Sequence, residues 1–143
     1  SDRIASLRIG VWYATPQPLA LLQGSFTSAL AQARDGLIVL GYGTGNLPQG
    51  EDWDALFAQA QQQGTLVILG TQVPFGGTQS RYAAGIWLEA QGVLPAARLT
   101  LPAMVARLYW ICLTQHSPAQ RRRRWLYWLD AKSRYTPRME QQP

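Results

Sequence analysis

The stretch that decides the fold is "LIVL", residues 37–40, which runs directly into "GYGTGNLPQG", residues 41–50. A short, continuously apolar run is typical of a strand that is covered on both faces, as in a parallel sheet. Glycines at alternate positions permit backbone conformations in which the chain turns sharply away from the strand end. The two stretches together predict a buried strand followed by a loop at its carboxyl end, where parallel α/β sheets handle ligands.

Two more runs of β-forming residues flank this strand, "LRIGVWY" at residues 7–13 and "TLVIL" at residues 65–69. The segments between the three runs have a helical pattern. Residues 25–34 have helical composition, with Ser25 as the predicted cap, and residues 51–63 place apolar side chains at helical spacing. Strands that alternate with helices predict a mainly parallel sheet with right-handed crossovers.

Three more helices are predicted in the second half of the chain. The first spans residues 81–92, the second follows Thr100 as its cap, and the third follows Ser117 as its cap. We therefore expect an α/β fold with three layers, Rossmann- or flavodoxin-like, in which a mainly parallel sheet of about four strands carries helices on both faces. The sequence has no linker long enough to divide it, so residues 1–143 are predicted to form a single domain, with residues 135–143 as a frayed tail.

The composition excludes several classes of protein. The chain is 47% hydrophobic, so it has ample apolar surface to bury and is not expected to be disordered. It lacks an apolar run long enough to span a bilayer, and we expect no membrane association. Its single cysteine, Cys112, cannot form an internal disulfide and is expected to be a small buried residue, which suggests a reducing compartment.

The net charge of +5 is concentrated near the C-terminus. The run "RRRR" at residues 121–124 lies beside Trp125, Tyr127 and Trp128. This pattern has two readings, a solvated helix face or a surface that binds nucleic acid, phosphate or an acidic partner. We expect the solvated face and no nucleic-acid partner, because one basic turn is a weak footprint.

No complete catalytic set emerges from the residues alone. The chain has no G-x-S-x-G elbow, no P-loop and no cluster of metal ligands, so neither a metal nor another cofactor is expected. The one histidine, His116, follows a predicted helix end, where a surface role is expected. What remains is two loops at predicted strand ends, residues 41–50 and 70–79.

Three segments carry a resemblance to a known family. They are the Y-G-T-G-N-x-P loop at residues 42–48, the T-Q pair at residues 71–72 and "RYAAG" at residues 81–85. In this order and spacing the chain, over roughly residues 7–115, resembles the C-terminal domain of the bacterial L-asparaginase and glutaminase family, closer to the cytoplasmic type I branch.

This resemblance implies a share in amide hydrolysis, in which L-asparagine and water give L-aspartate and ammonia. In the family the nucleophilic threonine lies in a T-G-G-T-I segment, and a T-D-T motif and a lysine complete the set, all in a larger N-terminal domain. None of these motifs occurs here, so no catalytic residue is assigned to this chain and the chain alone is expected to be inactive. It is expected to supply loop residues to an active site shared with the N-terminal domain of a neighbouring subunit, in a cytoplasmic homo-oligomer.

By the same resemblance, Tyr42, Thr44 and Asn46 of the first loop and Thr71 and Gln72 of the second are the candidate site residues. Asn46 is expected to reach into the adjacent active site, with Thr44 as its support. The alternative is that Asn46 only stabilises the turn, which asparagine does well.

Two interpretations of the whole chain stay open on the sequence. The first is a domain of an amidohydrolase, with the N-terminal domain, a neighbouring subunit and a small amide such as L-asparagine as its partners. The second is a stand-alone binding or regulatory module that has the same fold and no catalysis.

Overall fold

The structure, a computed structural model, describes residues 2–41, 51–71 and 90–134. Within these ranges one four-stranded sheet runs in the order β1-β2-β3-β4, and every neighbouring pair is parallel. The strands are β1 (Ile9–Tyr13), β2 (Gly36–Gly41), β3 (Leu66–Thr71) and β4 (Leu94–Pro95). The helices are α1 (Asp2–Ser6), α2 (Leu19–Gln32), α3 (Glu51–Gln63), α5 (Leu101–Thr114) and α6 (Pro118–Arg134).

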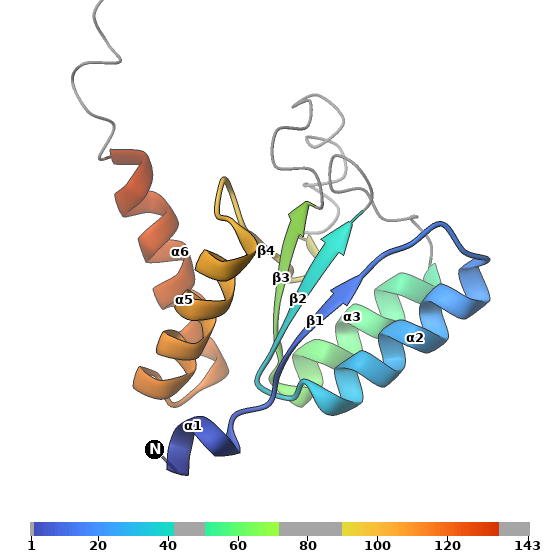
Figure 1. Cartoon of the computed structure of the whole chain (residues 1–143), viewed down its shortest axis with the longest axis horizontal. Helices are drawn as coiled ribbons and strands as arrows, with labels where there is room; N and C mark the ends of the chain where they lie inside the picture. The colour runs from blue at the N-terminus through green and yellow to red at the C-terminus, as the bar shows by residue number, and fades with distance from the viewer. Residues whose placement is uncertain (1, 42–50, 72–89, 135–143) are drawn as a thin grey trace, which may run out of the picture.

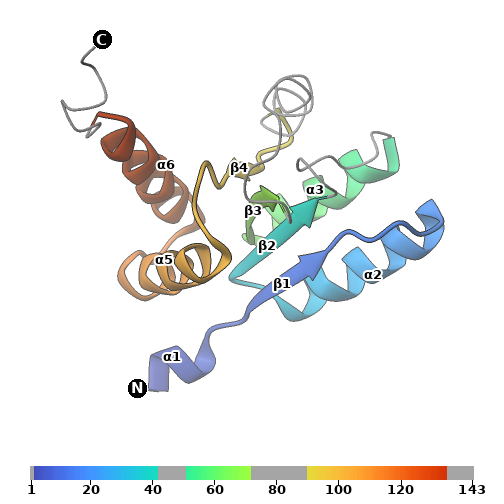
Figure 2. The same cartoon turned by 45° about the horizontal axis from the view of Figure 1, so that its top comes forward.

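The sheet is the middle of three layers. Helices α2 and α3 cover one face, and α5 and α6 lie on the other (Figures 1 and 2). Because the strands are added in chain order, right-handed crossovers place α2 and α3 on the same side of the sheet. The opposite face is then left for α5 and α6, which follow the last strand. The predicted three-layer α/β class with a mainly parallel sheet of about four strands is confirmed.

An aromatic cluster fills the core between the sheet and α2 and α3. The ring of Phe26 is central, with its centroid 5.1 Å from that of Trp12, 5.2 Å from Trp53 and 5.6 Å from Phe57, each approached edge to face. Such edge-on pairs are favoured by the ring quadrupole and contribute beyond the area they bury. All four rings are almost fully buried, and they join β1, α2 and α3 into one unit.

The second core lies between the sheet and α5 and α6. Ile38 and Ile68 alternate with the residues that face the aromatic cluster, so they point to this side, where they meet Met104, Leu108 and Trp125. The side chain of Leu108 packs directly over Gly36, where an added Cβ would lie only 2.7 Å from its Cδ2 atom. The missing side chain at Gly36 thus lets α5 approach the start of β2 closely.

The start of α2 differs from the sequence-based expectation. The helix begins at Leu19, ahead of the predicted cap Ser25, which lies inside it. The Ser25 hydroxyl instead accepts a hydrogen bond of 2.9 Å from the indole Nε1 of Trp12. A tertiary contact with β1 therefore uses the side chain that the local pattern assigned to a cap. Strand β4 was not located from the sequence, because two residues carry no periodic signal.

The caps of the last two helices are confirmed. The backbone N–H of Ala103 donates to Thr100 Oγ1 at 3.3 Å, and the N–H of Gln120 donates to Ser117 Oγ at 3.1 Å. Both hydroxyls satisfy amide groups that have no partner inside the helix. The helix predicted at residues 81–92 lies almost wholly outside the described residues.

Candidate active site

The carboxyl edge of the sheet brings the two predicted loops together at their origins. Strands β2 and β3 are parallel neighbours, and their last residues, Gly41 and Thr71, are paired with each other. Because parallel strands end at the same edge, the chain leaves β2 and β3 from adjacent points. The two segments that the sequence singled out therefore start side by side, as a shared ligand site requires.

The candidate site residues fall mostly beyond what the structure describes. Thr71 is the final residue of β3, and its backbone position is set by the pairing with Gly41. Tyr42, Thr44, Asn46 and Gln72 lie outside the described residues, so their expected roles stay predictions.

The aromatic cluster packs beneath the residues that border this edge, the end of β1 and the start of α3. Trp53 lies in the first turn of α3, just after the first loop, and its ring stacks on that of Phe57 at 6.0 Å. Trp12 lies near the end of β1, with its ring 6.0 Å from that of Trp53. The N–H of Ala14 extends the sheet pairing by donating to the carbonyl of Leu40 at 2.9 Å. The end of β1 and the start of α3 are thus joined by one buried cluster.

Two residues with reactive side chains, Cys112 and His116, do not belong to this edge. Nδ1 of His116 accepts a hydrogen bond of 3.0 Å from Arg3 of α1, and α1 lies at the opposite end of the strands (Figure 1). Cys112 is buried, and burial raises the pKa of its thiol to about 11, although the nearby Arg121 acts in the other direction. A neutral buried thiol is a poor nucleophile. The expectations of a surface histidine and a buried cysteine are confirmed.

The chemistry available at the edge is correspondingly limited. Across residues 2–41, 51–71 and 90–134, no three His, Cys, Asp or Glu side chains come together as a metal ion would need. Over the same ranges, no helix has the length and apolar character to cross a membrane. At this edge the described residues supply two adjacent points where loops begin, with a buried aromatic core beneath them.

The arginine run at residues 121–124 is for the most part not the solvated face that the sequence favoured. Arg121 forms an ion pair with Asp35, Arg122 donates to the carbonyl of Gly92 at 2.6 Å, and Arg124 lies over aromatic rings. Only Arg123 among the four is exposed. The side chains alternate in direction because each residue advances by about 100° around the helix.

Comparison with known proteins assigns the chain to a family. A family model described as the glutaminase/asparaginase C-terminal domain matches residues 19–126, which is most of the chain and includes both loops and most of both cores. The chain belongs to this family. The expected resemblance, drawn from residues 42–48, 71–72 and 81–85, is confirmed by this match.

Two asparaginases show how this C-terminal domain relates to longer proteins. The L-asparaginase of Thermococcus kodakarensis is 32% identical over 84 residues, which cover 57% of this chain and 25% of that protein. The crystal structure of L-asparaginase I from Vibrio cholerae matches with a TM-score of 0.71 and 26% identity, over 83% of this chain and 35% of that one. The chain therefore spans about a quarter to a third of the length of these relatives.

Proposed function

We propose that this chain is the C-terminal domain of an L-asparaginase-type amidohydrolase, which supplies the loops after β2 and β3 to an active site shared with an N-terminal domain of a neighbouring subunit. The observation that carries the proposal is the family match over residues 19–126, together with the pairing of Gly41 and Thr71 that sets both loop origins side by side. The reaction converts the side-chain amide of L-asparagine and water into L-aspartate and ammonia.

A share in the site, rather than a complete site, fits the chemistry of the described residues. Amide hydrolysis by this route needs an activated nucleophile and a base within hydrogen-bond reach of it. The thiol of Cys112 is buried in the second core, and His116 lies at the other end of the strands. In the proposal the nucleophile comes from the N-terminal domain, and this chain positions and encloses the substrate.

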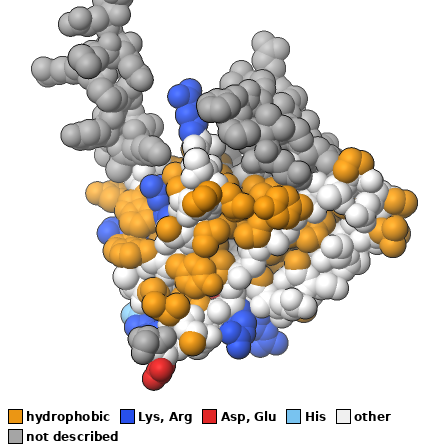
Figure 3. Space-filling view, viewed as in Figure 1, with side chains coloured by type: hydrophobic (Ala, Val, Ile, Leu, Met, Phe, Trp, Pro, Cys, Tyr) orange, Lys and Arg blue, Asp and Glu red, His pale blue; other side chains and the backbone are white. Residues whose placement is uncertain are grey.

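The surface of β1 supports an assembly. Ile9 packs against the second core, so Val11 and Tyr13, two and four residues further, point to the same side of the sheet. They are nevertheless 37% and 50% exposed, since α5 and α6 do not cover the edge strand fully. Hydrophobic side chains gather on this face (Figure 3). Contact with another domain or subunit would bury this apolar surface.

The same proposal covers the organisation and location of the protein. We propose that the 143 residues form one folded domain, that the functional assembly is a homo-oligomer, and that the protein is located in the cytoplasm. A single cysteine, with no partner in the chain for a disulfide, supports a reducing compartment.

Reconstitution tests the proposal. The chain is combined with an N-terminal domain of the asparaginase family that carries the T-G-G-T-I segment, and ammonia release from L-asparagine and L-glutamine is measured. We expect no turnover by either part alone and turnover by the complex. Replacing the nucleophilic threonine of that segment by alanine is the control and abolishes it. A complex that forms, as judged by sedimentation, but has no turnover supports the stand-alone module instead.

A further inference from the structure

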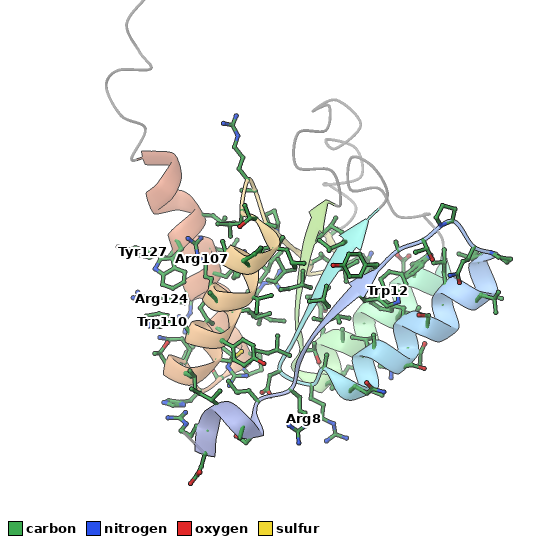
Figure 4. All side chains as sticks on the ribbon, in the orientation of Figure 1. Arg8, Trp12, Arg107, Trp110, Arg124 and Tyr127 are labelled. Atoms are coloured by element: carbon green, nitrogen blue, oxygen red, sulfur yellow. The ribbon has the colours of Figure 1, made fainter. Side chains whose placement is uncertain are left out.

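A cluster of arginine and aromatic side chains lies on the outer side of α5 and α6, away from the sheet. Its members, which we call the arginine–aromatic cluster, are Arg107, Trp110, Arg124, Tyr127 and Trp128. The first four are labelled in Figure 4. The rings of Trp110 and Trp128 lie 4.8 Å apart between centroids and join the two helices. The sequence signal for this cluster is the spacing of three or four residues that places an arginine and a ring on one helix face.

Two guanidinium groups share the indole of Trp128. That of Arg107 lies 4.8 Å from the ring centroid and that of Arg124 lies 5.8 Å from it. Arg124 also lies 5.5 Å from the ring of Trp110 and 5.4 Å from that of Tyr127. The negative ring face attracts each cation, so both guanidinium groups are held at the same indole despite their like charge.

The guanidinium groups of Arg107 and Arg124 have no carboxylate partner among the side chains that the structure describes. The ion pair in this part of the chain joins Arg121 of α6 to Asp35. Nη1 of Arg107 and Nε of Arg124 are buried without a hydrogen-bond acceptor. Burial also lowers the pKa of Arg107 from its ordinary value. Each guanidinium carries five N–H donors in a planar fork suited to phosphate or carboxylate oxygens.

The charge around the cluster has one sign. Helix α6 carries six basic residues against a single acidic one, Asp130, so a charge equal to that of the whole chain lies on this helix. Arg123 is exposed beside the cluster. Such a concentration of positive charge on one helix attracts polyanions at long range.

The aromatic members decide which polyanion fits. Tyr127 is 59% exposed and Trp110 is 42% exposed, on the same surface as the arginines. An acidic peptide would use the guanidinium groups and leave these rings unused. A single-stranded nucleic acid uses both, because its phosphates bind the cations while its unpaired bases stack on exposed rings. The bases of a duplex are already stacked on one another and cannot do so.

We propose that the arginine–aromatic cluster binds single-stranded nucleic acid, with Arg107, Arg124 and Arg123 on the phosphates and Tyr127 as the stacking ring. The basic turn alone is a weak footprint. The folded cluster adds two half-buried guanidinium groups, each with one buried nitrogen that has no acceptor, and exposed rings beside them. The site lies on the helices of the second core and not at the carboxyl edge of the sheet, so it does not depend on the proposed amidohydrolase function.

Fluorescence anisotropy with a labelled single-stranded oligothymidine or oligouridine of about 12 nucleotides tests this on the 143-residue chain. We expect a Kd of about 1 to 100 µM in low salt. Between about 50 and 200 mM salt, the slope of log K against log salt is expected to be about −2, because each phosphate neutralised on a single strand contributes about −0.7. Salt-independent binding, or none, would overturn the proposal.

A pair of double variants separates the cluster from the overall charge. Arg107→Gln with Arg124→Gln is expected to weaken binding by at least ~10-fold and to bring the slope to about −0.7, since one phosphate contact remains. Arg34→Gln with Arg98→Gln removes the same charge from exposed positions elsewhere and is expected to change Kd by less than ~2-fold. Equal losses in both double variants would mean diffuse attraction and would overturn the cluster as the site.

A second variant keeps the test valid if the arginine pair proves necessary for folding. Tyr127→Leu leaves the charge unchanged at an exposed position and is expected to weaken binding by at least ~5-fold, because a stacked base is lost. Tyr13→Leu, at an exposed tyrosine on β1, is its matched control and is expected to have no effect. Polyglutamate that binds as tightly as the oligonucleotide, or a duplex that binds equally well in the wild type and in Tyr127→Leu, would overturn the assignment to single strands.

Discussion

The guanidinium of Arg121 and the carboxylate of Asp35 lie 3.1 Å apart and join the start of α6 to the turn before β2. The second oxygen of Asp35 accepts from the backbone N–H of Arg8 at 2.8 Å. Arg121 also donates to the carbonyls of Gln115 and Cys112, the first of which lies just beyond the end of α5. One partly buried ion pair thus links the approach to β1, the start of β2 and the turn between α5 and α6.

Replacing Arg121 is expected to destabilise the whole domain. Arg121→Gln removes the ion pair and the hydrogen bonds to two carbonyls, and its side chain is only 14% exposed, so we expect a loss of about 1–3 kcal/mol in the free energy of unfolding. Urea unfolding followed by circular dichroism measures it. Arg123→Gln, two residues further along α6 and at an exposed position, is the matched control. It should change the free energy of unfolding by less than about 0.5 kcal/mol. Equal stability of both variants would refute the structural role of Arg121.

The conformation at Gly92 gives a prediction that two variants separate. Gly92 has φ of +81°, and an added Cβ would also collide with the side chain of Gln61, whose Nε2 donates to the carbonyl of Gln91 at 2.9 Å. We expect Gly92→Ala to cost about 1 kcal/mol for the strained φ, and a further few tenths because the exposed Gln61 side chain must move aside and give up this hydrogen bond. In a Gln61→Ala background the collision is absent, so the cost should fall to about 1 kcal/mol. An identical cost in both backgrounds, measured by thermal unfolding, would contradict the collision.

Cys112 gives the domain a defined response to alkaline pH. Burial raises the pKa of its thiol from 9.0 to about 11, so between these values the unfolded chain releases a proton that the folded chain retains. Stability should therefore fall as the pH rises from about 9 towards 11, and be unaffected by this group below about pH 8. The measurement is the free energy of unfolding against pH for the wild type and Cys112→Ala. The difference between the two curves should be flat at neutral pH and slope above it, and a curve that is flat throughout would contradict the burial.

Reactivity checks the same thiol independently. The buried neutral form should resist iodoacetamide at pH 8 in the native chain and react within minutes once the chain is unfolded in urea. Rapid native modification would show that the second core opens readily around Cys112.

Asn46 distinguishes a role in the proposed shared site from a role in the turn. If it acts in the site, Asn46→Ala should leave the stability of the isolated chain nearly unchanged and lower kcat/KM of the reconstituted enzyme by at least ~10-fold, or about 1.4 kcal/mol. Gln59→Ala, at an exposed position of α3, is the control. A chain destabilised by about 1 kcal/mol with unchanged kinetics would assign the residue to the turn alone.

Several features of this protein could be read from its sequence because they rest on local physics. The runs at residues 37–40 and 66–69 are apolar throughout, and a strand buried on both faces uses such a run fully. The caps Thr100 and Ser117 were predictable because a hydroxyl bonded to a nearby amide needs nothing beyond the helix end. The family followed from short loop motifs whose order is itself a property of the sequence.

Tertiary structure alone decided the features that depend on distant partners. Ser25 does not cap α2, because the helix begins at Leu19 and Ser25 lies inside it. Its hydroxyl accepts a hydrogen bond from the indole N–H of Trp12. The four adjacent arginines look alike in sequence, yet Arg121 finds Asp35 while Arg124 finds three rings, because the helix turns each towards a different neighbour. A local pattern fixes which groups a residue offers, and packing between segments far apart in the chain fixes which groups it meets.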